Sequence, residues 1–122
     1  ITLPEAVQFV VDSFERMVGG ELYVPKISSM KIMDLVEAIA PGSQTHEIGT
    51  RPGEKLHEEM ISEDDSRRTI DLGDRYCILP TIAAWGFEAP KGDAVEDGFA
   101  YRSNTNTEWL SVQDMRDLLE EA

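Results

Sequence analysis

The residues whose types and spacing best suit chemistry run from Gly49 to Lys55 and read GTRPGEK. The guanidinium of Arg51 presents a planar set of donors that fits two phosphate oxygens, and it stays charged at any working pH. Pro52 fixes one backbone dihedral and Gly53 permits a left-handed one, so the chain can turn sharply with Arg51 and Glu54 on a common side. A carboxylate in that position can accept hydrogen bonds from a vicinal diol such as a ribose.

An ordinary explanation of GTRPGEK also stands on spacing alone. A surface β-turn carrying an Arg–Glu ion pair needs no ligand, and such a pair contributes about 0–1 kcal/mol. The pattern by itself therefore leaves two interpretations open, a phosphate and diol site or an exposed turn.

Other kinds of chemistry find little support in this sequence. It has no GxGxxG or GxxxxGK[ST] loop for a dinucleotide or a nucleoside triphosphate. His46 and His57 lack the spacing of an HExxH zinc motif, and the acidic residues between 58 and 65 read as a solvated face. Ser28 and Ser29 lie at helix-cap positions, and Cys77 sits in an apolar run typical of a buried thiol. We therefore expect no metal site and no catalytic residue here.

The amino-acid composition limits the classes of partner that the chain is expected to bind. The chain has 122 residues, with 24 acidic against 11 basic side chains and a net charge of −13. Such a charge repels nucleic acid and anionic membrane surfaces, and no apolar run is long enough to span a bilayer. We expect one domain covering residues 1–122, located in the cytoplasm, with no nucleic acid and no membrane as partner.

The elements before the motif follow from periodicity and from capping signals. A capping box and an apolar face of period 3.6 predict a helix from Thr2 to Val18, which Gly19 and Gly20 end. A strand over 21–24 follows, and then a helix capped by Ser28 or Ser29 that ends at Pro41. Its predicted buried stripe consists of Ile32, Leu35, Val36 and Ile39, and a strand over 45–48 then leads into GTRPGEK.

The elements after the motif are shorter. Residues 55–61 favour a short helix or strand, and 62–68 form a charged connector. Strands over 69–72 and 76–79 flank a Gly-Asp turn, 80–107 looks irregular, and a cap at Ser111 starts a final helix. The order of elements predicts a small α/β unit with the character of an α+β subdomain.

Several segments together resemble a known family. They are LYVPKI at 22–27, Lys31-Ile32 with Asp34-Leu35, and GTRPGEKLHEEM at 49–60. In this order they resemble the C-terminal part of the UDP-N-acetylglucosamine 4,6-dehydratases, over essentially the whole chain. The pattern YRSNTN at 101–106 with Trp-Leu-Ser at 109–111 is similar to the tail of the inverting subgroup, which begins pseudaminic acid synthesis.

The resemblance implies a role for each part of the chain. These enzymes are extended short-chain dehydrogenase/reductases, in which a Rossmann domain binds NADP and a smaller C-terminal region binds the nucleotide sugar. By resemblance Arg51 contacts the UDP diphosphate, Glu54 contacts the uridine ribose, and Lys26 lies near the same pocket. The family's glycine-rich loop and Tyr-x-x-x-Lys pair are absent. We therefore expect a UDP-N-acetylglucosamine-binding fragment, inactive and without cofactor by itself, whose full-length form adds the N-terminal Rossmann domain and is a homo-oligomer.

Two alternatives remain at this stage. One keeps the superfamily and changes the reaction, to a retaining dehydratase or a nucleotide-sugar epimerase. The other is a noncatalytic nucleotide-sugar-binding module that is complete at this length.

Overall fold

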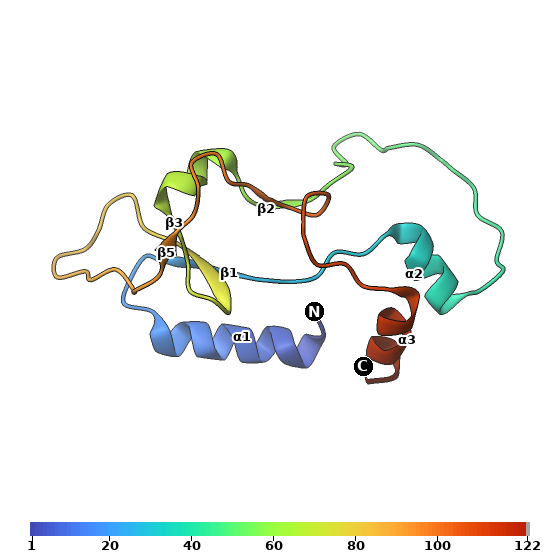
Figure 1. The fold of residues 1–122 in the computed structure, drawn as a ribbon, viewed down its shortest axis with the longest axis horizontal. Helices are drawn as coiled ribbons and strands as arrows, with labels where there is room; N and C mark the ends of the chain where they lie inside the picture. The colour runs from blue at the N-terminus through green and yellow to red at the C-terminus, as the bar shows by residue number, and fades with distance from the viewer. Residues whose placement is uncertain (122) are drawn as a thin grey trace.

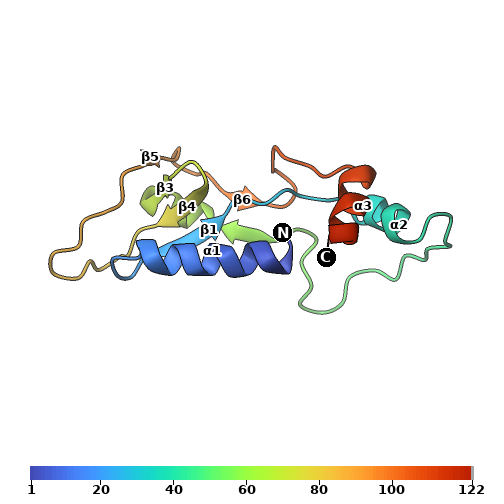
Figure 2. The same ribbon diagram turned by 90° about the horizontal axis from the view of Figure 1, so that it is seen from below.

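The computed structural model describes residues 1–121 and shows an elongated molecule with two halves (Figures 1 and 2). One half, here the sheet half, holds the strands and the first helix, and the other, the helix half, holds two shorter helices that pack together. The expected mixture of helices and strands is confirmed. The elements are α1 (Leu3–Arg16), β1 (Leu22–Pro25), α2 (Ile32–Ile39), β2 (Glu59–Ile61), the 3₁₀ helix η1 (Glu63–Arg68), β3 (Thr69–Asp71), β4 (Arg75–Ile78), β5 (Asp93–Ala94), β6 (Tyr101–Arg102) and α3 (Val112–Glu121).

A four-stranded antiparallel sheet in the order β1-β4-β3-β5 forms the centre of the sheet half. The predicted hairpin of β3 and β4 is confirmed, and its turn is closed by Leu72 N–H donating to the Arg75 carbonyl. Since side chains alternate along a strand, one face of the sheet presents apolar groups to the separate β2–β6 pair. The core there consists of Val24, Ile61 and Ile78, with Tyr76 tilted against Phe99 and Tyr101.

The opposite face of the sheet holds α1 through a buried arginine. Arg75 is only 4% exposed, donates to the Ser13 hydroxyl at 2.9 Å and pairs with Asp74 at 3.0 Å. Its guanidinium carbon also lies 4.6 Å from the centre of the Phe9 ring. Because the guanidinium bonds α1 and the β3–β4 turn at once, it fixes the helix on the sheet.

The predicted α1 is confirmed, including the Thr2–Glu5 capping box. Its apolar stripe, however, faces away from the sheet, which α1 contacts instead through Phe9 and Ser13. Along the stripe Leu3 is 77% exposed and Phe14 is 78% exposed. The free side of α1 lies along the edge of the molecule in Figure 1.

The helix half departs from the sequence-based expectation in two ways. The N-cap of α2 is Lys31, with no side-chain hydrogen bond, and neither Ser28 nor Ser29 fills that position. Ser29 is instead buried and pairs in parallel with Trp109. The predicted stripe of α2 is only half covered, because α2 packs mainly against α3. Leu35 and Val36 are partly buried, while Ile32 and Ile39 are exposed.

Local patterns were less informative between the helices. The strand predicted over 45–48 is wrong, since no neighbouring strand is there to pair with it, and 55–61 forms strand β2 only at its end. The charged connector contains η1, and the irregular 80–107 segment carries β5 and β6. The predicted cap of the last helix is confirmed, because Asp114 N–H donates to the Ser111 hydroxyl and the Asp114 carboxylate accepts from Ser111 N–H.

Replacing Arg75 tests the attachment of α1. Arg75→Met keeps much of the apolar stem but removes the hydrogen bonds to Ser13 and Asp74, and hydrogen bonds to charged groups contribute about 1.5–3 kcal/mol. We expect the free energy of unfolding, measured by urea denaturation, to fall by about that amount. The matched control is Arg67→Met, because Arg67 and its partner Asp97 are 79% and 73% exposed. That change should cost about 1 kcal/mol or less. Equal losses in the two variants would contradict the role given to Arg75.

Candidate nucleotide-binding loop and its anchors

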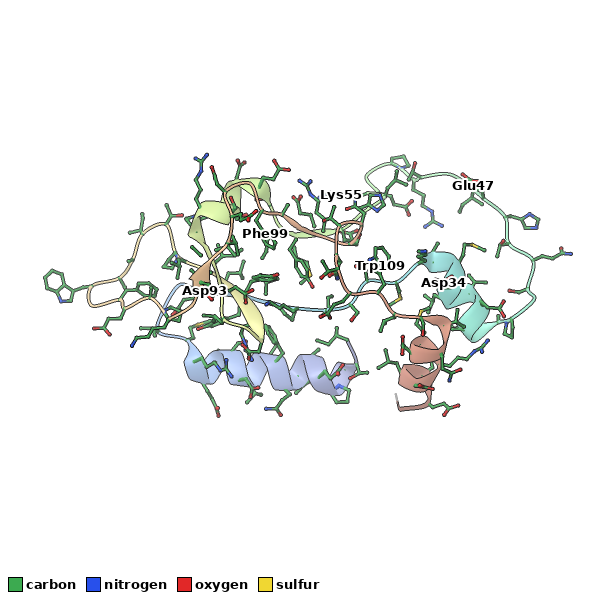
Figure 3. All side chains as sticks on the ribbon, viewed as in Figure 1. Asp34, Glu47, Lys55, Asp93, Phe99 and Trp109 are labelled. Carbon is green, nitrogen blue, oxygen red and sulfur yellow. The ribbon has the colours of Figure 1, made fainter. Side chains whose placement is uncertain are left out.

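GTRPGEK lies in a long exposed segment between α2 and β2, here called the 40–58 loop. It contains no helix or strand and arcs away from the rest of the molecule in both views (Figures 1 and 2). Figure 3 labels Glu47 on its outer arc and Lys55 near its return to β2. Residues 41–60 are exposed throughout, so the described part of the chain leaves this loop open to solvent.

Within the loop, Arg51 and Glu54 hold one another. Arg51 N–H donates to Oε2 of Glu54 at 2.7 Å, and Glu54 N–H donates to the Arg51 carbonyl at 3.0 Å. Pro52 and Gly53 occupy the two central positions, where the φ of +86° at Gly53 fits the third residue of a type II turn. Nε of Arg51 lies 3.9 Å from Oε1 of Glu54, so the two side chains do share one side of the turn.

The segment 101–110 anchors the far end of this loop and also the connection between β1 and α2. At the far end β6 pairs with β2, and Glu58 exchanges hydrogen bonds with Ser103, at 3.0 Å to its hydroxyl and 2.9 Å from its backbone N–H. In the connection between β1 and α2, Ser29 N–H donates to the Glu108 carbonyl and the Ser29 carbonyl accepts from Leu110 N–H. Between these points the Tyr101 hydroxyl donates to the Ile27 carbonyl and accepts from Ile27 N–H, each at 2.8 Å.

Asn106 completes the anchor. Its amide nitrogen donates to the Ile27 carbonyl at 2.7 Å and to the Ser29 hydroxyl at 3.2 Å. Sequence reasoning treated the YRSNTN pattern only as a mark of resemblance and missed this positioning role for Tyr101 and Asn106. The signal available was the concentration of hydrogen-bonding side chains in a stretch without helix or strand periodicity.

Lys26 lies in a different part of the fold, at the end of β1. Its ammonium donates to both carboxylate oxygens of Asp71, at 2.7 and 2.8 Å, and lies 4.6 Å from the centre of the Tyr76 ring. It also lines a cavity of about 320 Å³ that carries the carboxylates of Glu5 and Asp74. Among the residues that the structure describes, no hydrogen bond or ion pair joins Lys26 to Arg51 or Glu54.

The Lys26–Asp71 pair shifts the titration of both groups. Burial opposes ionisation of Asp71, but the hydrogen bonds from Lys26 and from Gly73 N–H lower the pKa of its carboxyl overall. Burial likewise disfavours the charged form of Lys26, yet the bonds and the negative charge of Asp71 raise the pKa of its ammonium. Both groups are therefore held in their charged forms, which strengthens the pair.

The structure offers neither a metal centre nor a membrane-spanning helix among residues 1–121. Within residues 1–121, no group of three or more His, Cys, Asp or Glu side chains is placed to hold a metal ion. None of the helices in this range is long and apolar enough to cross a membrane.

The pH dependence of stability tests the Lys26–Asp71 pair. The folded-state pKa of Asp71 is lowered, so its contribution is present above the ordinary aspartate pKa of about 3.9 and is lost as the pH falls through the folded value. Asp71→Asn should cost about 1 kcal/mol at pH 7, since both side chains are about one-third exposed, and the deficit should shrink toward pH 3. Thermal unfolding from pH 3 to 7 measures it, with Asp97→Asn as the exposed control. A deficit independent of pH would rule out this electrostatic cause.

The chain is similar to a protein family, to several longer proteins and to a solved structure. The sequence profile of a family described as "Polysaccharide biosynthesis protein" matches residues 1–80. Two proteins of Campylobacter jejuni strains named UDP-N-acetylglucosamine 4,6-dehydratase (inverting) are 44% and 43% identical over 98% of this chain. A UDP-glucose 4-epimerase of Rickettsia canadensis is 30% identical over 98%. The structure of Pen from Bacillus thuringiensis superposes with a TM-score of 0.81 at 25% identity, covering 99% of this chain.

The match is to part of each longer protein. This chain spans 38% of the length of the dehydratases and 37% of the length of the epimerase and of Pen. The resemblance drawn from residues 22–27, 49–60 and 101–111 is thus confirmed as a similarity over nearly the whole chain. With two-thirds of its residues matched by the family profile, the chain belongs to the polysaccharide biosynthesis protein family.

Proposed function

We propose that this chain is the substrate-binding part of a larger UDP-N-acetylglucosamine 4,6-dehydratase and that the turn at residues 49–55 grips the UDP portion of the substrate. The observation that carries the proposal is the pairing of Arg51 with Glu54 on an exposed turn, in a chain 44% identical to proteins of that name. An exposed arginine with a single weak side-chain partner keeps donors free for a ligand.

The chemistry of the two side chains suits a nucleoside diphosphate. The Arg51 guanidinium fits two diphosphate oxygens with charge-assisted hydrogen bonds. Oε1 of Glu54, which is not the oxygen that accepts from Arg51 N–H, is available to a ribose hydroxyl. Lys26 has a third N–H besides those that Asp71 accepts, and this is the donor it would offer to the substrate.

The remaining part of the protein would supply the reaction. This chain lacks the glycine-rich loop and the Tyr-x-x-x-Lys pair of extended short-chain dehydrogenase/reductases. In the proposed full-length enzyme an N-terminal Rossmann domain would hold NADP, which would supply the hydride chemistry of the dehydration, while this chain would bind the UDP portion of the substrate. The YRSNTN tail, which resembles that of the inverting subgroup, favours the inverting reaction that leads toward pseudaminic acid. The proposal also takes the full-length enzyme to be a homo-oligomer of the cytoplasm.

The outward face of α1 supports contact with such a domain. Leu3, Val7, Val10 and Phe14 are each more than half exposed, and Val11 and Val18 widen the patch. Contiguous apolar surface of this kind usually marks an interface. Because this chain spans only 38% of its dehydratase relatives, the proposed occupant is the Rossmann domain of the same protein.

A second candidate function is a UDP-sugar epimerase. The relative from Rickettsia canadensis carries the name UDP-glucose 4-epimerase and is 30% identical over nearly the whole chain. An epimerase would use the same UDP contacts and differ in the fate of the sugar, as would a retaining dehydratase. The higher identity to the inverting dehydratases favours the first proposal.

Arg51 provides the direct test of UDP binding. In the full-length protein, Arg51→Ala should weaken UDP affinity by about 1.5–3 kcal/mol, the range for hydrogen bonds to charged groups. Isothermal titration calorimetry measures the change. Arg67→Ala is the matched control, because the Arg67 side chain is about as exposed as that of Arg51 and the substitution removes the same positive charge. Unchanged UDP affinity in Arg51→Ala, or an equal loss in both variants, would remove the diphosphate assignment.

An activity assay tests whether this chain only binds the substrate while the rest of the full-length protein carries out the reaction. The 122-residue chain alone, incubated with UDP-N-acetylglucosamine and NADP, should form no 4-keto-6-deoxy sugar, whereas the full-length protein should form it. Mass spectrometry of the product shows the loss of one water. Product from the chain alone would contradict the proposal, and a full-length protein that only interconverts sugar epimers would favour the epimerase.

A further inference from the structure

We infer that Glu54 is a positioning residue for Arg51. The Glu54 carboxylate stabilises the turn that presents the Arg51 guanidinium to the diphosphate. The inference rests on the proposed function and deepens it, because it gives Glu54 a task that does not involve the ribose.

The Arg51–Glu54 contact is the main internal restraint of this loop. Among residues 1–121, the hydrogen bonds made by residues 44–57 are the two that join Arg51 and Glu54. The nearest other bonds are at the loop ends, where Ser43 bonds to the Ala40 carbonyl and Glu58 bonds to Ser103. Ordering each residue of an exposed stretch costs conformational entropy, so a stretch of this length stays ordered only where local interactions offset that cost. Glu54 therefore provides the one local interaction that opposes loosening near Arg51.

The geometry of the contact is reciprocal. The Glu54 side chain accepts from Arg51 N–H while the Glu54 backbone N–H donates to the Arg51 carbonyl, which closes the turn from both sides. The other carboxylate oxygen faces Nε of Arg51 at 3.9 Å. One side chain thus restrains both the backbone and the guanidinium of Arg51, and a pre-ordered donor loses less entropy when it binds its ligand.

Electrostatics separates this role from simple anion binding. A carboxylate close to a bound diphosphate repels it, so a residue with no positioning role would hinder phosphate binding, and its removal would help. A positioning residue has the opposite signature, since its removal loosens Arg51. Glutamine keeps an amide oxygen that can accept from Arg51 N–H and loses the negative charge. Glu54→Gln should therefore retain the turn, while Glu54→Ala should lose it.

The test uses inorganic pyrophosphate, which has no ribose, beside UDP in the full-length protein. Calorimetry gives the affinity, and the pyrophosphate signal that Arg51→Ala abolishes defines binding at this site. Hydrogen–deuterium exchange of the Arg51 amide reports the turn without any ligand. The matched control is Glu47→Ala, which removes an exposed carboxylate from the same loop (Figure 3).

We expect Glu54→Ala to weaken Arg51-dependent pyrophosphate binding about 2- to 10-fold, the effect of one modest hydrogen bond, and to speed exchange of the Arg51 amide. Glu54→Gln should restore both, and Glu47→Ala should change neither. Pyrophosphate binding in Glu54→Ala that equals or exceeds the wild type would overturn the inference and leave Glu54 as a ribose contact only. Unchanged amide exchange in that variant would overturn it too.

The two proposals fail differently. If the wild-type protein binds neither UDP nor pyrophosphate, the proposed function is wrong, and the positioning of Arg51 for a diphosphate falls with it. If UDP binds through Arg51 but the alanine variant keeps a protected Arg51 amide, the function stands and the positioning role alone is refuted.

Discussion

The double hydrogen bond between the Tyr101 hydroxyl and the backbone of Ile27 is the contact on which the arrangement of this molecule depends. It joins β6 to the segment between β1 and α2, which leads into the helix half. On either side of this contact, residues 101–110 pair with β2 and with Ser29. The C-terminal end of the exposed 40–58 loop and the connection that leads into α2 are thereby held by the same stretch of chain.

In this arrangement the sheet half is the well-packed part of the molecule, and the 40–58 loop is the part that is accessible to a ligand. Arg75 on one face of the sheet and the aromatic group around Tyr76 on the other hold the sheet half together. The 40–58 loop runs from α2, which packs on α3, to β2, which pairs with β6. Its middle is exposed, and the hydrogen bonds between Arg51 and Glu54 hold one turn there. Functional loops are commonly displayed on a scaffold in this way. Under the proposed function, the loop forms one wall of a UDP site, and the Rossmann part of the protein supplies the wall that carries the chemistry.

How far the sequence predicts this structure depends on whether the signal is local. The Thr2–Glu5 box, the Gly-Asp turn before Arg75 and the Ser111 cap each depend on residues within a few positions, and each was predicted. The Pro-Gly pair similarly predicted that Arg51 and Glu54 would share a side of the turn. The strand expected at 45–48 failed because a strand requires a partner, and β2 found its partner in β6 instead.

Contacts between distant residues explain the rest. The partner of Lys26 is Asp71 on another strand, and nothing in the sequence near either residue indicates it. Phe9 and Ser13 of α1 face Arg75, while the larger apolar stripe of the helix stays exposed. This orientation follows from long-range contacts, among them the Arg75–Ser13 and Arg16–Asp74 hydrogen bonds, and not from helical periodicity. The course of the connection between β1 and α2 likewise depends on Tyr101 and Asn106, which lie far along the chain from it.

The most direct test of the central claim, that the turn at residues 49–55 grips UDP, is hydrogen–deuterium exchange of the full-length protein with and without UDP. The account predicts that the amides of residues 49–55 become protected when UDP binds, more than those of the equally exposed outer arc around Glu47. UDP binding that leaves residues 49–55 unprotected, with the protection confined to other parts of the protein, would contradict it.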